Sequence, residues 1–168
     1  MSGNGKLEGD KLRITVISDS HGQTRILRRI LDERSDSDHI FFLGDKVSDL
    51  DGIQLQYPQK TFYTVSGNCD YFSLQPASDI ALVADTRIFF THGHTLGVKH
   101  GPENLIRTAK AANCRIALYG HTHIPQTVYE DGLFVVNPGS CAEPRSGAPT
   151  YAVIDIEANG ILPTIIQI

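Results

Sequence analysis

Short hydrophobic runs alternate with polar, turn-forming segments along most of this chain. Five of the runs are rich in β-branched or aromatic residues and span positions 12–17, 40–43, 62–65, 88–90 and 116–119. Glycine, asparagine and aspartate residues bound them. Runs of this length and composition predict β-strands.

Two other segments place their apolar residues with helical spacing. Thr24 can cap a helix in which Ile26, Leu27, Ile30 and Leu31 share one face. A second helix is predicted from about Pro102 to about Asn113, because proline is favoured in a first helical turn. Each helix precedes a predicted strand, which indicates βαβ units.

The last third of the chain has a different pattern. Asp131-Gly132 separates the runs 127–130 and 133–136, as expected for a hairpin, and the runs 150–156 and 161–167 flank another turn. We therefore expect an α/β fold in which two packed sheets form a β-sandwich flanked by helices. The stretch 69–78 is the longest without a predicted element, and 143–149 is a second turn-rich loop.

A candidate metal ligand follows each of the first five runs. In chain order these ligands are Asp19 and His21, then Asp45, Asn68, His92, and finally His121 and His123. The carboxyl ends of the strands in an open α/β sheet form one edge, where ligands bind. We therefore expect these side chains to converge.

The ligand types indicate which ions the site would hold. Imidazole, carboxylate and carboxamide together suit Mn²⁺, Fe²⁺, Zn²⁺ or Ni²⁺. A structural zinc site is disfavoured, because Cys69, Cys114 and Cys141 are scattered and form no C-x-x-C pair. Seven ligands fit two ions that share a carboxylate and leave positions open for water and substrate. Two such ions about 3.5–4 Å apart can clamp the attacking and leaving oxygens of a phosphoryl displacement, so we predict phosphoester hydrolysis.

The ordered motifs resemble the signature of the calcineurin-like metallophosphoesterases, which is D-x-H, G-D, G-N-x-D, H-G-H and G-H-x-H. This chain matches it with Asp19-Ser20-His21, Gly44-Asp45, Gly67-Asn68-Cys69-Asp70, His92-Gly93-His94 and Gly120-His121-Thr122-His123. The chain also contains Asn137-Pro138-Gly139-Ser140. With this motif included, it resembles the small YfcE-like phosphodiesterase branch over about residues 12–168.

The resemblance implies a metallophosphoesterase-like αββα sandwich with a dinuclear metal centre. By this resemblance one ion is held by Asp19, His21 and His123, the second by Asn68, His92 and His121, and Asp45 bridges them. It also implies that a water bridging the two ions is the nucleophile, and that the substrates are small phosphodiesters. Manganese is the ion we expect, with iron, nickel and zinc as alternatives.

Three further residues are candidate substrate contacts. Cys69 stands where many family members carry a histidine that contacts phosphate or protonates the leaving group. His94 is the nearest spare imidazole by sequence and is our candidate proton donor, a role that contributes about 10²–10⁴-fold. Arg145 can bind a phosphate bidentately, and a structural ion pair is an equal alternative.

Other polar residues have ordinary explanations. Asp70 either orients a histidine ligand or starts the turn into Tyr71. We expect Asp49 and Asp51 in a solvated loop, His39 and His100 at the surface, and Cys114 in the core.

Composition limits the remaining possibilities. The 168 residues suit a single domain over 12–168, preceded by a flexible extension at 1–11. A net charge of −4 argues against a long nucleic acid as partner. The chain has no long apolar run or hydrophobic leader, and its three cysteines have no paired spacing, so we expect a cytoplasmic protein with no membrane partner. A homo-oligomer remains open.

Two other functions compete with a phosphodiesterase. A phosphomonoesterase or nucleotide hydrolase would use the same ligands with a different substrate pocket. A protein-binding scaffold is the second alternative, because the retromer-subunit branch looks similar in fold and works by binding other proteins. The chain keeps all seven ligand positions, which favours an enzyme.

Overall fold

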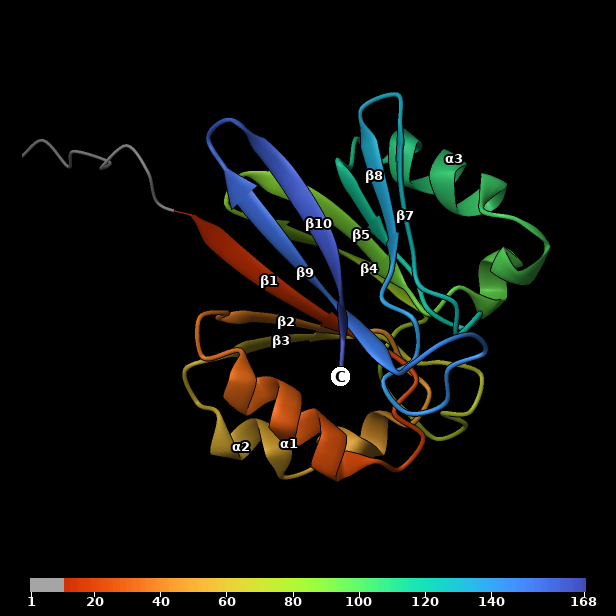
Figure 1. The fold of residues 1–168 in the computed structure, drawn as a ribbon. Coiled ribbons are helices and arrows are strands. Elements are labelled where there is room, and N and C mark those ends of the chain that lie inside the picture. Colours follow the sequence, from red (N-terminus) through yellow and green to blue (C-terminus); the bar gives the residue numbers. More distant parts are fainter. Residues whose placement is uncertain (1–10) are drawn as a thin grey trace, which may run out of the picture.

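Two five-stranded sheets pack face to face in the computed structural model, which describes residues 11–168 (Figure 1). The first sheet has the order β10-β9-β1-β2-β3, formed by Gly160–Gln167, Thr150–Glu157, Leu12–Ile17, His39–Phe42 and Thr61–Thr64. The second has the order β4-β5-β6-β8-β7, formed by Ser78–Val83, Thr86–Thr91, Ile116–Leu118, Leu133–Asn137 and Gln126–Glu130. The predicted extension at 1–11 lies outside the described residues, except for Lys11.

Helices cover the outer faces of both sheets. The helices α1 (Thr24–Glu33) and α2 (Ile53–Gln56) lie on the first sheet, and α3 (Glu103–Ala111) lies on the second (Figure 1). Three single 3₁₀ turns occur at η1 (Val47–Leu50), η2 (His94–Leu96) and η3 (Val98–His100). This architecture confirms the predicted αββα sandwich.

Three apolar layers follow from this arrangement. Strand residues alternate between the faces, so Ile14 and Val16 of β1 enter the layer between the sheets, whereas Ile17 packs outward with α1. On the other side, Leu105 and Ala109 of α3 pack against Ala117 and Val135 of the second sheet. Strands covered on both faces read as continuous apolar runs, which is why the sequence pattern located them.

The parallel strands determine where the loops gather. In the first sheet β1, β2 and β3 are parallel, and in the second β5, β6 and β8 are parallel. The segments that follow these strands therefore gather at one end of each sheet.

The structure corrects two expectations about local structure. The stretch 69–78 is followed by a strand, β4, that the sequence reading missed. It pairs with β5 across a turn at Ala84-Asp85, which lacks the Asn-Gly or Asp-Gly signal of tight hairpins. Thr24 does not cap α1, because the cap position is Gln23, and the side chain of Gln23 makes no capping hydrogen bond. By contrast, α3 begins one residue after Pro102, in agreement with the predicted start.

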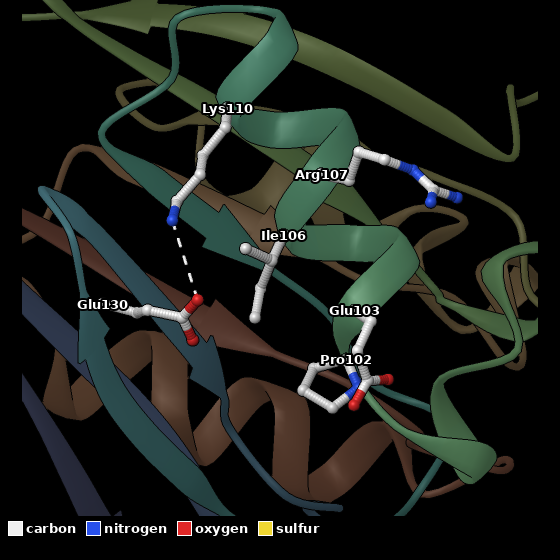
Figure 2. A pocket seen from close by; sticks show the side chains of 6 residues that line it. All are labelled: Pro102, Glu103, Ile106, Arg107, Lys110 and Glu130. Atoms are coloured by element: carbon white, nitrogen blue, oxygen red, sulfur yellow. Dashed lines mark ion pairs between the residues drawn. The ribbon is translucent and has the colours of Figure 1, made fainter.

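An open groove lies at the surface between α3 and β7 (Figure 2). It is lined by Pro102, Glu103, Ile106, Arg107, Lys110 and Glu130, none of which is a candidate site residue. Lys110 pairs with Glu130 across it at 3.6 Å. Within residues 11–168, no helix has the length and apolarity needed to cross a membrane.

A cross-strand ion pair joins β1 to β9. Arg13 lies directly opposite Asp155, and its guanidinium donates to both carboxylate oxygens, at 2.7 and 3.0 Å. Lys11 lies 2.7 Å from the same carboxylate. The pKa of Asp155 is lowered below its ordinary value, first by the Arg13 hydrogen bonds and, against the opposing effect of burial, by Lys11.

We predict that Asp155→Asn lowers the free energy of unfolding at neutral pH by about 1–2 kcal/mol, because hydrogen bonds to charged groups are worth more than neutral ones. A carboxyl whose folded-state pKa is depressed stabilises the fold fully above its unfolded pKa of about 4, and loses this effect as the pH falls through the folded pKa. Urea unfolding across that range should therefore show the difference shrinking. The control Glu157→Gln, at an exposed carboxylate 3.7 Å from Lys11, should change stability by less than about 0.5 kcal/mol. A loss that is independent of pH would contradict the assignment.

Candidate metal centre

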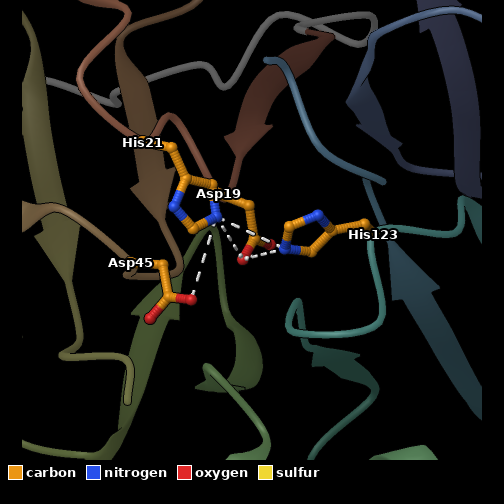
Figure 3. Close-up of side chains that lie close together, drawn as sticks. All are labelled: Asp19, His21, Asp45 and His123. Carbon is orange, nitrogen blue, oxygen red and sulfur yellow. Dashed lines mark hydrogen bonds and ion pairs between the residues drawn. The ribbon is translucent and has the colours of Figure 1, made fainter. Parts of the chain in front are cut away.

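The first group of ligands gathers Asp19, His21, Asp45 and His123, whose ligating atoms lie within 4.8 Å of one another (Figure 3). His123 Nε2 lies 3.1 Å from Asp19 Oδ1 and 3.3 Å from His21 Nε2. His21 Nε2 lies 3.9 Å from Asp45 Oδ2. The first three of these residues follow β1 and β2 of the first sheet, and His123 follows β6 of the second.

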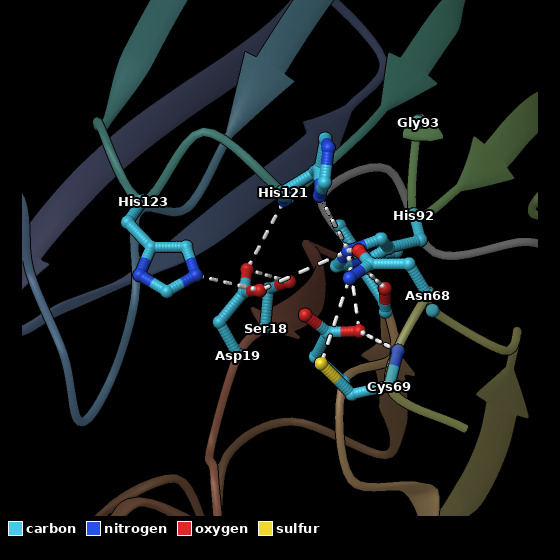
Figure 4. A network of polar contacts seen from close by, with 12 residues as sticks. Ser18, Asp19, Asn68, Cys69, His92, Gly93, His121 and His123 are labelled. Carbon is cyan, nitrogen blue, oxygen red and sulfur yellow. Dashed lines mark hydrogen bonds and ion pairs between the residues drawn. The ribbon is translucent and has the colours of Figure 1, made fainter. Parts of the chain in front are cut away.

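The second group gathers Asp45, His92 and His121, with Asn68 beside them (Figure 4). His92 Nε2 lies 3.1 Å from His121 Nδ1, 3.1 Å from Asn68 Oδ1 and 3.4 Å from Asp45 Oδ1. Asp45 therefore presents one oxygen to each group. The structure thus brings all seven predicted ligands together, with Asp45 between the two groups.

In two of the imidazoles, the nitrogen that points away from the site is hydrogen-bonded to a backbone carbonyl. This bond determines that the other nitrogen, which faces the site, is an acceptor. His92 Nδ1 lies 2.7 Å from the carbonyl of Leu43, and His123 Nδ1 lies 2.6 Å from the carbonyl of Glu143. A carbonyl only accepts, so each Nδ1 carries a proton, and in the neutral ring Nε2 is left with a lone pair. Both Nε2 atoms thus point lone pairs at carboxylate, carboxamide or imidazole acceptors. A cation between them would turn this repulsion into coordination.

The close packing of imidazoles and carboxylates also shifts the pKa values of these side chains. Burial would raise the pKa of Asp45, but its hydrogen bond with His92 and the charge of that ring outweigh burial and lower it. The pKa of His123 is raised, chiefly by the neighbouring carboxylate of Asp19. Burial and the neighbouring His92 lower the pKa of His121 to about 4. The carboxylates thus favour positive charge between them and the imidazoles, and a metal ion would supply this charge in place of protons.

Asp19 supplies a further test of whether the residues fit metal ions. The residue is fully buried, and its Oδ2 accepts hydrogen bonds from Ser18 Oγ at 2.6 Å and from the His121 backbone N–H at 3.2 Å. Its Oδ1 has no hydrogen-bond partner within the described part of the chain. A buried carboxylate oxygen without a donor, facing imidazole lone pairs, is the arrangement expected of a metal ligand. The site therefore fits divalent cations.

Comparison with known proteins gives the family of the chain. The model of the calcineurin-like phosphoesterase superfamily domain matches residues 12–159. The chain belongs to the calcineurin-like phosphoesterase superfamily. Phosphodiesterase YfcE of Escherichia coli K12 is 28% identical over 183 residues, covering 92% of this chain and 91% of that protein. This membership confirms the predicted resemblance and the prediction of a metallophosphoesterase.

Solved structures agree with the fold. A predicted phosphoesterase from Streptococcus pneumoniae TIGR4 has a TM-score of 0.80 at 27% identity, covering 94% of this chain and 90% of that one. Vacuolar protein sorting 29 from Cryptosporidium parvum has a TM-score of 0.79 at 17% identity, covering 94% and 92%. The second likeness concerns the fold alone.

Most of the candidate ligand positions in this phosphoesterase domain have a left-handed backbone. The φ angles of Asp19, His21, Asp45, His121 and His123 are 57°, 44°, 57°, 67° and 59°. Non-glycine residues rarely adopt this conformation, which costs about 1–2 kcal/mol at each position. Specific interactions must therefore hold these loops in place.

Close backbone approach explains two of the motif glycines. A Cβ on Gly67 would lie 2.1 Å from Asp45 Oδ1, and a Cβ on Gly120 would lie 2.1 Å from Ser18 Oγ. Any side chain there would displace the Asp45 or Ser18 side chain, so both positions require glycine.

Asp70 has a role that neither sequence expectation described. Its carboxylate accepts four backbone N–H bonds, from Asp45, Lys46 and Val47 in one loop and from Gly67 in another, at 2.7 to 2.9 Å. It therefore fixes the loop of the shared ligand and ties it to the loop of Asn68. It orients backbone rather than a histidine ring. Its carbonyl also accepts from the Ser73 N–H, so Asp70 starts the turn through Tyr71, as one of the two predictions had it.

Asp49 contradicts the expectation of a solvated loop. Its carboxylate is 5% exposed and accepts hydrogen bonds from Ser20 Oγ and the Gly22 backbone N–H, because η1 folds back under the loop that follows β1. Asp51 is exposed, as predicted. His100 is exposed, whereas His39 is half-buried, with its Nδ1 3.1 Å from the Tyr63 hydroxyl. Cys114 lies in the core layer under α3, as expected.

The segment 137–140 supports the loops from the opposite side. Asn137 donates through Nδ2 to the carbonyl of Gly120 and to the hydroxyl of Thr122, while Ser140 donates to the carbonyl of Asp19. The sequence identified this motif only by resemblance. These bonds give it a physical function, because they hold the loops of His121, His123 and Asp19.

The three predicted substrate contacts lie around the ligands. Cys69 is exposed, its backbone N–H donates to Asp45 Oδ1 at 3.0 Å, and burial and then Asp45 raise the pKa of its thiol. The ring of His94 lies 5.4 Å from that of His92, and its buried Nδ1 has no partner within residues 11–168. Arg145 is exposed, and its backbone N–H donates to the carbonyl of His123. No ion pair of the Arg145 side chain occurs within residues 11–168, so both of its predicted roles stay predictions.

We predict that Asp70→Asn lowers the free energy of unfolding by about 2–4 kcal/mol, because an amide NH₂ would face two backbone donors and leave them unsatisfied. Urea unfolding with a chelator present measures this without a contribution from metal. The matched control is Asp51→Asn at an exposed carboxylate, which should stay within about 0.5 kcal/mol of the parent. Equal stability of the two variants would show that the Asp70 bonds are dispensable.

Proposed function

We propose that this chain is a phosphodiesterase that holds two divalent cations, Mn²⁺ being the expected ion and Fe²⁺, Ni²⁺ or Zn²⁺ the alternatives. The observation that carries the proposal is the shared carboxylate. Asp45 presents one oxygen to His21 and the other to His92, and each imidazole belongs to a separate cluster of inward-facing acceptors. Two clusters joined in this way suit a pair of neighbouring ions.

The charges of the site favour an anionic substrate. The ligand set contains two carboxylates, Asp19 and Asp45, so its formal charge is −2, against +4 for two divalent ions. The remaining positive charge would attract a phosphate group even though the chain has a net charge of −4. When bound, the ions would supply Lewis acidity and activate water for attack on phosphorus.

The residues of the chain have separate roles in this proposal. The ligand loops hold the reacting phosphate in line, and Arg145 stands beside His123, where it can contact a non-bridging oxygen. His94 lies beside the second group, where it can donate a proton to the leaving oxygen. Asn68 and Cys69 are exposed, so the edge of the site is open and suits small substrates. A phosphodiesterase with 28% identity supports the choice of a diester.

A substrate panel separates this proposal from its alternatives. With Mn²⁺ present, a bis-aryl phosphate should be hydrolysed faster than an aryl monophosphate, and cyclic nucleotides test the nucleotide reading. Preference for the monoester would favour a phosphomonoesterase. No turnover with full metal occupancy would favour a protein-binding role, as the fold shared with vacuolar protein sorting 29 allows.

We predict two Mn²⁺ ions per chain. Asp45→Ala should weaken both ions, whereas His21→Ala should weaken chiefly the one in the first group, because Asp45 lies between the groups and His21 belongs to one. Elemental analysis and calorimetric titration measure the stoichiometry and the affinities. A single ion at saturating Mn²⁺, or equal minor losses in the two variants, would contradict the shared-carboxylate assignment.

We predict that the leaving group controls the rate. An alkyl leaving group needs a proton more than an aryl one, so His94→Ala should slow alkyl diesters by about 10²-fold and aryl diesters much less. Both proteins must be compared fully metal-loaded, because His94 is close to the ligand His92. His100→Ala at an exposed histidine is the control and should leave both rates unchanged. Equal slowing of alkyl and aryl substrates would remove His94 as the proton donor.

A further inference from the structure

Few hydrogen bonds form within the loop that carries Asp19 and His21. Its residues Asp19, His21 and Gly22 have φ angles of 57°, 44° and 91°, so three of four consecutive positions are left-handed. A turn from Gln23 N–H to the carbonyl of Ser20 closes the loop before α1. Hydrogen bonds from Ser18 and Ser140 fix Asp19 itself, but they do not reach His21.

His21 also differs from His92 and His123 in how its ring is held. The rings of His92 and His123 each donate from Nδ1 to a backbone carbonyl. In the described part of the chain, the ring of His21 makes its hydrogen-bond contact through Nε2, the atom that faces the site. The direction of this ring therefore depends on where the backbone places it.

Asp49 brackets this residue on both sides. Its Oδ2 accepts from Ser20 Oγ at 2.6 Å and from Gly22 N–H at 2.7 Å, so it binds the residue before and the residue after His21. Both Asp49 and Ser20 are buried. Asp49 is supplied by η1, which begins two residues after Asp45 in the chain. The carboxylate thus ties the His21 loop to the loop of the shared ligand.

We infer that Asp49 is a positioning residue that sets the affinity of the first ligand group for its cation by orienting His21, without acting on the second group. The inference rests on the proposed two-ion centre. Residues that orient a metal ligand from behind typically change metal affinity by about 10–100-fold when removed. His21 belongs to the first group alone, so the effect should be selective.

The test measures Mn²⁺ affinity by calorimetry with each group isolated in turn. In a His121→Ala background, which disables the second group, Asp49→Ala should raise the dissociation constant by about tenfold or more. In a His123→Ala background, which disables the first group, Asp49→Ala should leave the constant unchanged within about twofold. Equal weakening in both backgrounds, or no weakening in either, would overturn the inference.

Two further variants separate positioning from a general loss of structure. Both donors converge on one oxygen, so the carbonyl of Asp49→Asn can accept both bonds and should restore most of the affinity lost in Asp49→Ala. Asp51→Ala, at an exposed carboxylate two residues along, should match its parent. Failure of Asp49→Asn to restore affinity would also overturn the inference. The stoichiometry of the unmutated protein tests the two-ion proposal separately. A single ion at saturating Mn²⁺ would contradict that proposal, whereas two ions together with equal effects of Asp49→Ala in both backgrounds would contradict this inference alone.

Discussion

The left-handed backbone of five ligand positions is the constraint on which the centre depends. These five positions have φ angles from 44° to 67° although none of them is glycine. At about 1–2 kcal/mol each, these conformations together oppose folding by an amount comparable to the whole stability of a domain. Their persistence requires compensation within the same loops. The site is therefore a set of strained turns held by dedicated hydrogen bonds.

Hydrogen-bond acceptors and donors behind the candidate ligands supply that compensation, and they act on different loops. Asp70 accepts from the loops of Asp45 and Asn68, while Asp49 accepts from the loop of His21. Asn137 donates to the loop of the last two histidines. Because each of these side chains holds one or two loops, substituting one of them should distort those loops and leave the rest of the site in place. A preorganised site of this kind is built from backbone hydrogen bonds as much as from its ligands.

The sequence located the candidate ligands but not the residues that support their loops, for a physical reason. Ligands follow apolar runs, so strand ends and residue types locate them without knowledge of tertiary contacts. Asp49 and Asp70 reach their hydrogen-bond partners only when η1 and the segment after β3 fold back under the strand ends. No periodic pattern in the sequence predicts this folding back. The same limit explains the missed β4, whose hairpin turn at Ala84-Asp85 lacks glycine or asparagine, and Thr24, whose neighbour Gln23 occupies the cap position without a side-chain hydrogen bond.

Each ligand group draws on both sheets, and this couples the centre to the sandwich itself. The first group combines residues after β1 and β2 with His123 after β6, and the second combines residues after β2 and β3 with His92 and His121 after β5 and β6. Without a cation, the acceptors facing each other across the two sheets repel. With one, the same atoms would cross-link the sheets at the end where the apolar layer between them stops. Ligand atoms contributed by both sheets are brought together only in the folded chain, so the free energy of ion binding would stabilise the packing of one sheet on the other.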